Sequence, residues 1–259
     1  MIVAGVDGVP LAVTEFGGAS GPGILLLHGL MGRASTWWAD ARWLRALGRV
    51  VAYDARGHGH SGAPDGPYDR DAFVGDAAAV IRALGLAPAV VIGHSMGGLT
   101  AWQLAGRHPD LVRGVVIGDM SARTGPSMDW WRSWIAGWPV PFPSLAAVRV
   151  HYGRDGDYFT EVMGEGPDGY RPLARPEVLL AAREHWDDRD MMAELDAVRC
   201  PVLVVGGAQT DGDLPTMREM ADRLTHGSYV EVPGAGHVVH WDNPAGWRAV
   251  VEPFVRSLS

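Results

Sequence analysis

Residues 89–98, AVVIGHSMGG, decide the fold because they join a buried strand to a helix. The apolar run before the serine is short, which is typical of a strand covered on both faces. Ser95 stands where this run gives way to helical spacing, and a G-x-S-x-G string at such a junction forms a sharp elbow that exposes the hydroxyl. Gly93 and Gly97 leave out side chains that would collide where strand and helix approach. Ser95 is therefore the candidate nucleophile, with a purely structural serine turn as the alternative.

The alternation of strand and helix continues on both sides of this elbow. Short apolar or alternating runs predict strands at residues 11–16, 23–29, 50–54, 89–95, 112–119, 201–207 and 228–233. Segments with helical spacing occur at residues 36–47, 69–85, 96–109, 215–225 and 243–258. Strands that alternate with helices in this way form a mostly parallel, doubly wound sheet with helices on both faces. The sequence therefore predicts an α/β fold.

Residues 121–199 break this rhythm. The interval is rich in Trp, Pro, Gly and Arg and shows helical pieces without an obvious core strand; five of the 11 tryptophans fall in it, at positions 130, 131, 134, 138 and 186. We expect a core of residues 1–120 and 200–259 and an inserted helical cap, or lid, of residues 121–199. Such a cap would cover the carboxyl end of the sheet, where ligands bind in open α/β folds. Packing of the cap on the core is the alternative role for any one of these tryptophans.

The composition favours small-molecule chemistry. The 259 residues carry a formal net charge of −8 without a run of basic residues, which argues against nucleic acid or an anionic membrane surface as a partner. The apolar runs are too short to span a bilayer and the first residues do not form a secretory signal, so we expect a cytoplasmic protein. Neither metal-ligand spacing nor a nucleotide-binding glycine loop occurs, so we expect no metal and no other cofactor. The sequence does not indicate an oligomeric state.

With these motifs in order, the sequence resembles the α/β-hydrolase family. Besides GHSMGG, the matching pieces are LLLHGLMG at residues 25–32, YDARGHGHSG at 53–62, PVLVVGGAQTD at 201–211 and GAGHVVHWDNP at 234–244. Together they cover almost the whole chain apart from the expected cap. The resemblance implies a catalytic triad in the chain order serine, acid, histidine.

The resemblance places the general base late in the chain. His237 follows a predicted strand in the glycine-bracketed loop GAGH, which would bring its imidazole to the same end of the sheet as Ser95. His240, three residues further on, is the alternative base.

The acid that orients the base is expected at Asp211, in the loop after the predicted strand at residues 201–207. Two alternatives stay open. Asp213 lies two residues further along the same loop, and Asp119 follows an earlier strand, where some members of the family carry their acid. The sequence does not say which carboxylate points inward.

Two backbone N–H groups are expected to form the oxyanion hole. One is that of Met96, at the start of the helix that follows the elbow, where the helix dipole favours a negative charge. The resemblance places the second donor in the loop after the strand at 23–29, which gives the N–H of Leu30, with Gly29 allowing the chain to turn. His28 is expected to hold this loop in shape.

These residues predict a serine hydrolase that cleaves a carboxylic ester, thioester or lactone through an acyl-enzyme. The aromatic cap suggests an apolar or aromatic group on the substrate, with Trp130, Trp131 and Trp134 as candidate contacts. Arg33 and Arg123 lie just after strand ends near the expected mouth of the site, where either would suit a substrate carboxylate.

Other activities fit the same triad. Hydrolysis of a carbon–carbon bond in a diketone is one, although relatives of that kind commonly have Asn where this chain has His94. A perhydrolase or cofactor-free haloperoxidase is another, and a ligand-binding protein without turnover would keep the same scaffold. Dehalogenases and epoxide hydrolases are disfavoured, because they use Asp where Ser95 stands.

Overall fold

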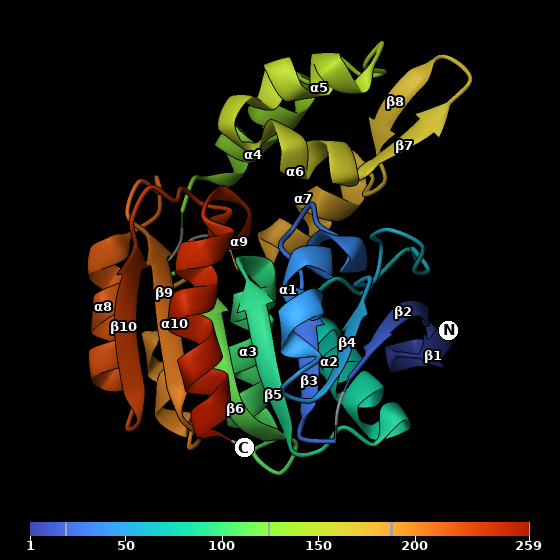
Figure 1. Ribbon diagram of the computed structural model, residues 1–259. Helices are drawn as coiled ribbons and strands as arrows, with labels where there is room; N and C mark the ends of the chain where they lie inside the picture. Colours follow the sequence, from blue (N-terminus) through green and yellow to red (C-terminus); the bar gives the residue numbers. More distant parts are fainter. Residues whose placement is uncertain (19, 124, 187–188, 259) are drawn as a thin grey trace.

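An eight-stranded sheet forms the centre of the computed structural model, which describes residues 1–18, 20–123, 125–186 and 189–258. The strands follow the order β1-β2-β4-β3-β5-β6-β9-β10 across the sheet (Figure 1). They are β1 (Ile2–Ala4), β2 (Pro10–Gly17), β3 (Gly23–Leu27), β4 (Arg49–Tyr53), β5 (Ala89–His94), β6 (Val112–Gly118), β9 (Val202–Gly207) and β10 (Gly227–Val232). Neighbours from β4 to β10 are parallel, whereas β2 pairs antiparallel with both β1 and β4. The predicted mostly parallel sheet is confirmed, and β1 is an additional edge strand that the sequence did not predict.

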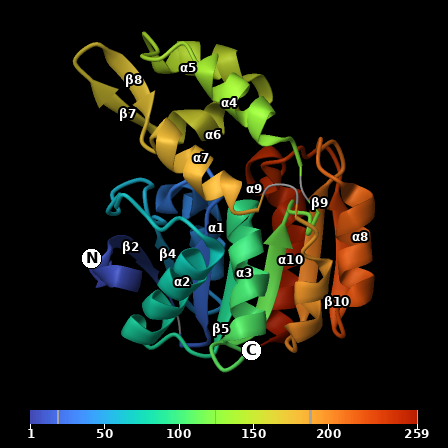
Figure 2. The same cartoon turned by 180° about the vertical axis from the view of Figure 1, so that it is seen from behind.

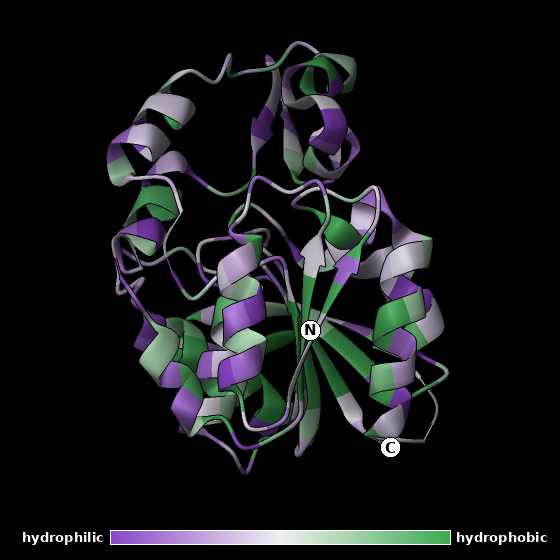
Figure 3. Ribbon diagram, turned by 90° about the vertical axis from the view of Figure 1, so that its left-hand side faces the viewer, coloured by the Kyte–Doolittle hydropathy of each residue, from purple (hydrophilic) through white to green (hydrophobic). Residues whose placement is uncertain are grey.

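Helices cover both faces of this sheet. One face carries α2 (Arg70–Leu84), α3 (Met96–Arg107) and α8 (Leu214–Arg223), and the other carries α1 (Trp38–Leu44) and α10 (Pro244–Ser257). Figures 1 and 2 show the two faces from opposite sides, and Figure 3 shows the apolar strands between the helix layers. Successive residues of a strand point to opposite faces of the sheet. Val91 therefore packs in the first core, on the face of α2, α3 and α8, and Ile92 packs in the second core, on the face of α1 and α10. Among the described residues, no helix has the length and apolar character needed to cross a bilayer.

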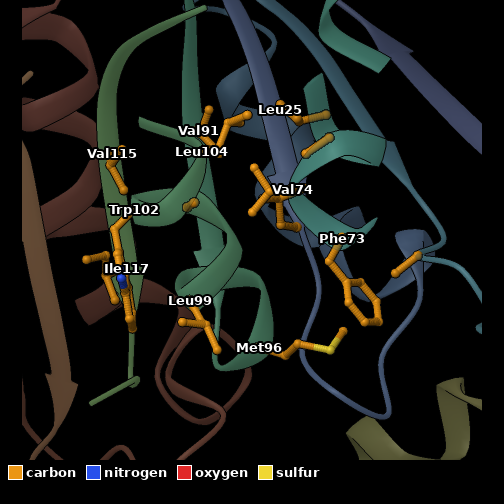
Figure 4. Close-up of a cluster of buried hydrophobic side chains, with 14 of the residues drawn as sticks. Leu25, Phe73, Val74, Val91, Met96, Leu99, Trp102, Leu104, Val115 and Ile117 are labelled. Carbon is orange, nitrogen blue, oxygen red and sulfur yellow. The ribbon is translucent and has the colours of Figure 1, made fainter. Parts of the chain in front are cut away.

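The first core, which includes Val91, is the larger of the two. It contains the buried side chains of α3, the helix that starts at the Ser95 turn. Figure 4 shows Trp102 and Leu99 of α3 beside Ile117 of β6, and Met96 facing Phe73 of α2. All of these side chains are buried, and Trp102 is fully so. Because removing a buried tryptophan costs about 3–5 kcal/mol, this packing fixes the position of α3 and of the residue before it.

A separate layer of elements is inserted between β6 and β9. It contains α4 (Met128–Ala136), α5 (Leu145–Tyr152), α6 (Gly156–Glu161), β7 (Met163–Gly166), β8 (Gly169–Pro172) and α7 (Pro176–Glu184). Figures 1 and 2 both show this layer beyond one end of the sheet. Its β7–β8 hairpin was not predicted from the sequence, which indicated helical pieces only.

The two stems of the insertion leave the core side by side. The N–H of Met191 donates to the carbonyl of Ala122 at 2.8 Å, and Arg123 and Asp190 form an antiparallel bridge. The first stem begins four residues after β6 ends, and the second returns shortly before β9. The central sheet therefore continues from β6 to its neighbour β9 without the inserted layer interrupting their pairing.

Candidate active site

Ser95 lies on a strained turn between β5 and α3. Its backbone has φ 50° and ψ −121°, a conformation that a residue with a side chain rarely adopts. A Cβ on Gly93 would lie 2.2 Å from the Gly97 carbonyl oxygen, and one on Gly97 would lie 2.1 Å from that of Leu27. The glycines that bracket Ser95 are therefore required by close backbone approach, and the local geometry is that of a nucleophile elbow.

His237 forms a hydrogen bond with a carboxylate from a different part of the sequence. It lies in the loop after β10, and its Nδ1 is 2.7 Å from Oδ2 of Asp119, the residue that follows β6. The Asp119 side chain is fully buried, and its backbone has φ 45°. Its Oδ1 accepts the N–H of Gly207 at 2.9 Å, and Oδ2 also accepts the hydroxyl of Thr210 at 2.7 Å. The carboxylate is thus held in one orientation, directed at the imidazole.

The structure does not bring the preferred acid, Asp211, to His237. Asp211 is exposed, and Asp213 caps α8 by accepting the N–H and hydroxyl of Thr216 at 3.0 and 2.6 Å. The loop after β9 instead turns so that Thr210 binds the carboxylate of Asp119. The expectation that Asp211 faces the base is therefore wrong in this geometry, and the alternative Asp119 occupies that place.

One sequence signal pointed to Asp119. It is the last residue of the predicted strand at residues 112–119, and β6 is the direct neighbour of β5, which Ser95 follows. In the sheet, β6 lies between β5 and β9, so the strand that Asp119 follows is the direct neighbour of the strand that precedes Ser95. Strand order across the sheet was not available from the sequence, so this signal could not outweigh the resemblance.

The environment of His237 raises the pKa of its imidazole above the ordinary value of 6.5. Desolvation by burial is the largest effect and lowers this pKa. The hydrogen bond and the charge of Asp119, with the charges of Asp155 and Asp242, together outweigh it. The side chain is nevertheless 47% exposed, so one edge of the ring remains open to a reacting group.

His94 links the base loop to the nucleophile elbow. Its Nε2–H donates to the backbone carbonyl of His237 at 2.8 Å, and the two ring centroids are 4.8 Å apart. Burial, and next the charges of His237 and His240, hold the pKa of His94 well below its ordinary range, so the ring is neutral. Within the described residues, Ser95 Oγ is not assigned a hydrogen bond, and the backbone N–H of Ser95 donates to the carbonyl of Gly118 at 2.8 Å.

The alternative base, His240, is enclosed in the protein interior, with its ring centroid 5.1 Å from that of His94. It is buried, its ring stacks on Trp37 with centroids 4.2 Å apart, and neither ring nitrogen has a partner in the described part of the chain. Burial, followed by the charge of His237, lowers the pKa of His240 to about 3. It is therefore a neutral packing residue at physiological pH.

Both predicted oxyanion donors adjoin Ser95. Met96 is the first residue of α3, and the first N–H groups of a helix have no acceptor within the helix. The N–H of Leu30 donates no hydrogen bond within the described residues. A Cβ on the preceding residue, Gly29, would lie 3.3 Å from Cβ of Ser95, so this loop passes directly against the elbow.

The two predicted substrate arginines are both engaged by protein carboxylates. Arg33 lies 3.5 Å from Glu161 of α6, and its Nε donates to the hydroxyl of Ser35 at 2.5 Å. Arg123 makes two hydrogen bonds to Glu219, at 2.5 and 2.9 Å, and one to Asp190 at 3.2 Å. The structure therefore gives each guanidinium an internal partner.

The candidate tryptophans form one cluster on α4. Trp130 stacks on Trp134 with ring centroids 5.6 Å apart, and Trp131 meets both rings edge to face. Trp130 is 46% exposed, whereas Trp131 and Trp134 are half-buried against the larger core. Trp131 and Trp134 are thus more enclosed than Trp130, and Trp134 also contacts Trp138 and Tyr152 of the same inserted layer.

A pocket of about 340 Å³ lies beside the base and contains residues that the sequence did not indicate. It is lined by Arg154, Asp155, Asp157, Tyr158, Trp241 and Asp242, which come from the inserted layer and from α9 (Val239–Asp242). Most of these residues belong to the insertion and do not directly follow a strand of the central sheet, so the pattern used to find the other candidates does not reveal them. The described residues contain no group of three His, Cys, Asp or Glu side chains suited to hold a metal.

Comparison with known proteins identifies one family that covers most of this chain. The sequence profile described as "Alpha/beta hydrolase family" matches residues 24–250. The 3-oxoadipate enol-lactonase 2 of Acinetobacter baylyi is 27% identical over 97% of this chain and 95% of its own length. The mouse sn-1-specific diacylglycerol lipase ABHD11 is 30% identical over 92% of this chain and 82% of its own length.

Solved structures share the fold over nearly the full length. An E-2-(acetamidomethylene)succinate hydrolase superposes with a TM-score of 0.87 at 24% identity, covering 98% of both chains. The enol-lactonase from Burkholderia xenovorans LB400 superposes with a TM-score of 0.80 at 26% identity, covering 98% of this chain and 99% of its own. The profile matches most of the sequence, including the strands of the sheet from β4 to β10 and the turn at Ser95. This chain therefore belongs to the alpha/beta hydrolase family.

Proposed function

We propose that this protein is a serine hydrolase that cleaves a carboxylic ester, thioester or lactone of a small molecule. The observation that carries the proposal is the 2.7 Å contact between Asp119 and Nδ1 of His237. It lies beyond the carboxyl ends of the strands, at the same end of the sheet as the strained turn at Ser95. A carboxylate on Nδ1 orients the imidazole and leaves Nε2 as the proton acceptor. A serine on such an elbow presents its Oγ to a substrate.

In the proposed reaction, Ser95 Oγ attacks the substrate carbonyl while Nε2 of His237 takes the hydroxyl proton. The N–H groups of Leu30 and Met96 bind the oxyanion of the tetrahedral intermediate. The imidazolium then protonates the leaving alcohol or thiol as the acyl-enzyme forms. Water, deprotonated by His237, attacks the acyl carbonyl and releases the acid with Ser95 restored. Catalytic hydrogen bonds are often long in the free enzyme and shorten with substrate bound, so we expect the Ser95–His237 hydrogen bond to form in the substrate complex.

Asp119 is the proposed acid of this triad. Its three hydrogen-bond donors are the backbone of Gly207, the hydroxyl of Thr210 and the imidazole itself. The first two fix the carboxylate, so that it can direct Nδ1–H and stabilise the imidazolium that forms during attack. Asp211 has no such position, because its side chain is exposed to solvent.

The substrate proposal combines the cap with the named activities of the relatives. We assign residues 121–199 as the cap, and Trp131 and Trp134 as an apolar wall against which a substrate group packs. Among similar proteins are enol-lactonases, a diacylglycerol lipase and esterases. These names support ester and lactone bonds as the substrates to test first.

The experiment compares wild type with Ser95→Ala on p-nitrophenyl butyrate and on a lactone. Ser133→Ala is the matched control, because Ser133 is an exposed serine on α4. We expect a burst and steady release of p-nitrophenol from wild type and the control, and only background from Ser95→Ala. Release that survives in Ser95→Ala would contradict the proposal. Inactive wild type that instead cleaves a diketone would indicate the carbon–carbon hydrolase, and binding without turnover would indicate a ligand-binding protein.

A further inference from the structure

Leu30, the proposed oxyanion donor of the β3 loop, lies between two peptide groups whose carbonyls each face a buried histidine. Nδ1 of His28 is 2.7 Å from the carbonyl oxygen of Gly29, and Nε2 of His58 makes a hydrogen bond with the carbonyl oxygen of Leu30. Both imidazoles are buried, and their centroids are 5.2 Å apart. His58 comes from the RGHGH turn after β4, a motif that the triad does not use.

The hydrogen bonds of His28 define its protonation. Its Nε2 accepts the backbone N–H of Ala55 at 2.9 Å, so the proton lies on Nδ1 and is donated to Gly29. Burial, and next the nearby His58, lower the pKa of His28 to about 4, in agreement with a neutral ring. Both nitrogens are therefore satisfied by backbone groups from two different loops.

This contact acts on the peptide group that carries the oxyanion donor. The carbonyl of Gly29 and the N–H of Leu30 belong to one planar, trans peptide unit, in which the two groups point in opposite directions. Holding the carbonyl on His28 therefore fixes the direction of the Leu30 N–H. A hydrogen bond to the carbonyl also polarises the same peptide unit, which strengthens the N–H as a donor.

His58 acts on the following peptide group. Its Nε2 faces the Leu30 carbonyl, and its Nδ1 lies 2.9 Å from the carbonyl oxygen of Arg56. Burial lowers the pKa of His58, so the ring is neutral and has one N–H for two acceptors. With the proton on Nε2, Leu30 is held on both sides, by His28 through the preceding peptide and by His58 through the following one.

We propose that His28 and His58 are positioning residues that together set the direction of the Leu30 N–H toward the oxyanion formed at Ser95. We call this pair the histidine clamp. The proposal rests on the serine hydrolase function proposed above, and it assigns to the RGHGH turn a role in the reaction in addition to its role in folding.

A second contact keeps the two loops together when the clamp is altered. Asp54 accepts the N–H of Ala34 through Oδ1 and the N–H of His60 through Oδ2, both at 2.7 Å. These bonds join the end of the β3 loop to the turn after β4 without either histidine. Clamp variants are therefore expected to fold while the direction of the Leu30 N–H changes.

The test uses amide side chains that copy one ring nitrogen each. Asn places its amide near the position of Nδ1, and Gln places its amide near Nε2. At position 28 the donor is Nδ1, so His28→Asn should keep kcat within a few-fold while His28→Gln loses roughly 10- to 100-fold, less than the loss of a whole donor. At position 58 the proposed donor is Nε2, so the order should be reversed, with His58→Gln active and His58→Asn impaired.

The decisive readout is the affinity of a trifluoromethyl ketone, which forms a tetrahedral oxyanion with the nucleophilic serine. In the impaired variants its Ki should rise by the same factor by which kcat falls, while KM for p-nitrophenyl butyrate and the melting temperature stay close to wild type. A purely structural role would lower stability or raise KM without this match.

Three results would overturn the histidine clamp. They are equal losses in both amide variants at each position, the opposite order at position 58, and an unchanged Ki in an impaired variant. If one variant fails to fold, the pair at the other position still decides between the orders. Failure of the proposed function looks different, because wild type itself would then neither release p-nitrophenol nor bind the ketone covalently.

Discussion

Asp119 and His237 are 118 positions apart in the chain, yet Oδ2 of Asp119 lies 2.7 Å from Nδ1 of His237. Both residues lie beyond the carboxyl ends of the strands, as Ser95 does. Parallel strands make this possible, because the loops after β6 and β10 leave from the same end. One consequence is direct. Asp119→Asn should lower kcat by roughly 10⁴-fold, since the base loses both its orientation and the partner of its imidazolium.

The matched control for this substitution is Asp211→Asn, which changes the exposed carboxylate of the neighbouring loop. It should retain wild-type kcat on p-nitrophenyl butyrate, and circular dichroism should show both variants folded. A large loss in Asp211→Asn with little change in Asp119→Asn would reverse the assignment of the acid.

The pH dependence follows from the carboxylates around His237. The base must be neutral to accept a proton, so activity rises as pH passes upward through its pKa. Because Asp155 helps to raise this pKa, Asp155→Asn should move the acid limb of kcat/KM to lower pH by a fraction of a unit. Asp157→Asn is the control, since Asp157 pairs with Arg149 at 2.5 Å. An acid limb that stays in place in Asp155→Asn would mean that this carboxylate does not act on the base.

Arg33 is predicted to act through Glu161 rather than through the substrate. The pair is partly exposed and joins the core to α6, so either Arg33→Gln or Glu161→Gln should change the free energy of unfolding by at most about 1 kcal/mol. The two variants should alter KM equally, and the double variant should add nothing further. A rise in KM found only in Arg33→Gln, with an anionic ester, would restore the substrate-binding role.

The elbow should not tolerate a side chain at position 97. A Cβ there would lie 2.1 Å from the backbone oxygen of Leu27, which cannot move without displacing β3. Gly97→Ala should therefore lower the free energy of unfolding by roughly 1–3 kcal/mol or more and abolish activity. Gly125→Ala adds a Cβ with no heavy atom within 4 Å and should match wild type in urea unfolding. Equal stability of the two variants would contradict the close approach at the elbow.

Local chemistry was sufficient to predict the scaffold. The apolar run before Ser95 and the helical spacing after it define an elbow regardless of the rest of the chain, and short apolar runs such as residues 201–207 become strands buried on both faces. The sheet with its helices is confirmed, because burial of such runs leaves few other arrangements.

The partners of the site depend on which strands are neighbours. Asp119 and Asp211 both follow strands, and only the pairing of β6 with β5 and the turn made by Thr210 distinguish them. The ion pairs of Arg33 and Arg123, and the pocket around Asp155, likewise join segments far apart in sequence. Contacts between side chains that are far apart in the chain produce no local sequence pattern, so they could not be predicted.

The paired stems of the insertion have a consequence for how specificity changes in such a chain. Because Ala122 and Met191 are joined by a backbone hydrogen bond, residues between them can be lengthened, shortened or exchanged while the ends stay in register. The proposed triad of Ser95, His237 and Asp119 lies outside that segment. We therefore expect the inserted segment to be exchangeable for another without disturbing the residues proposed to break the bond.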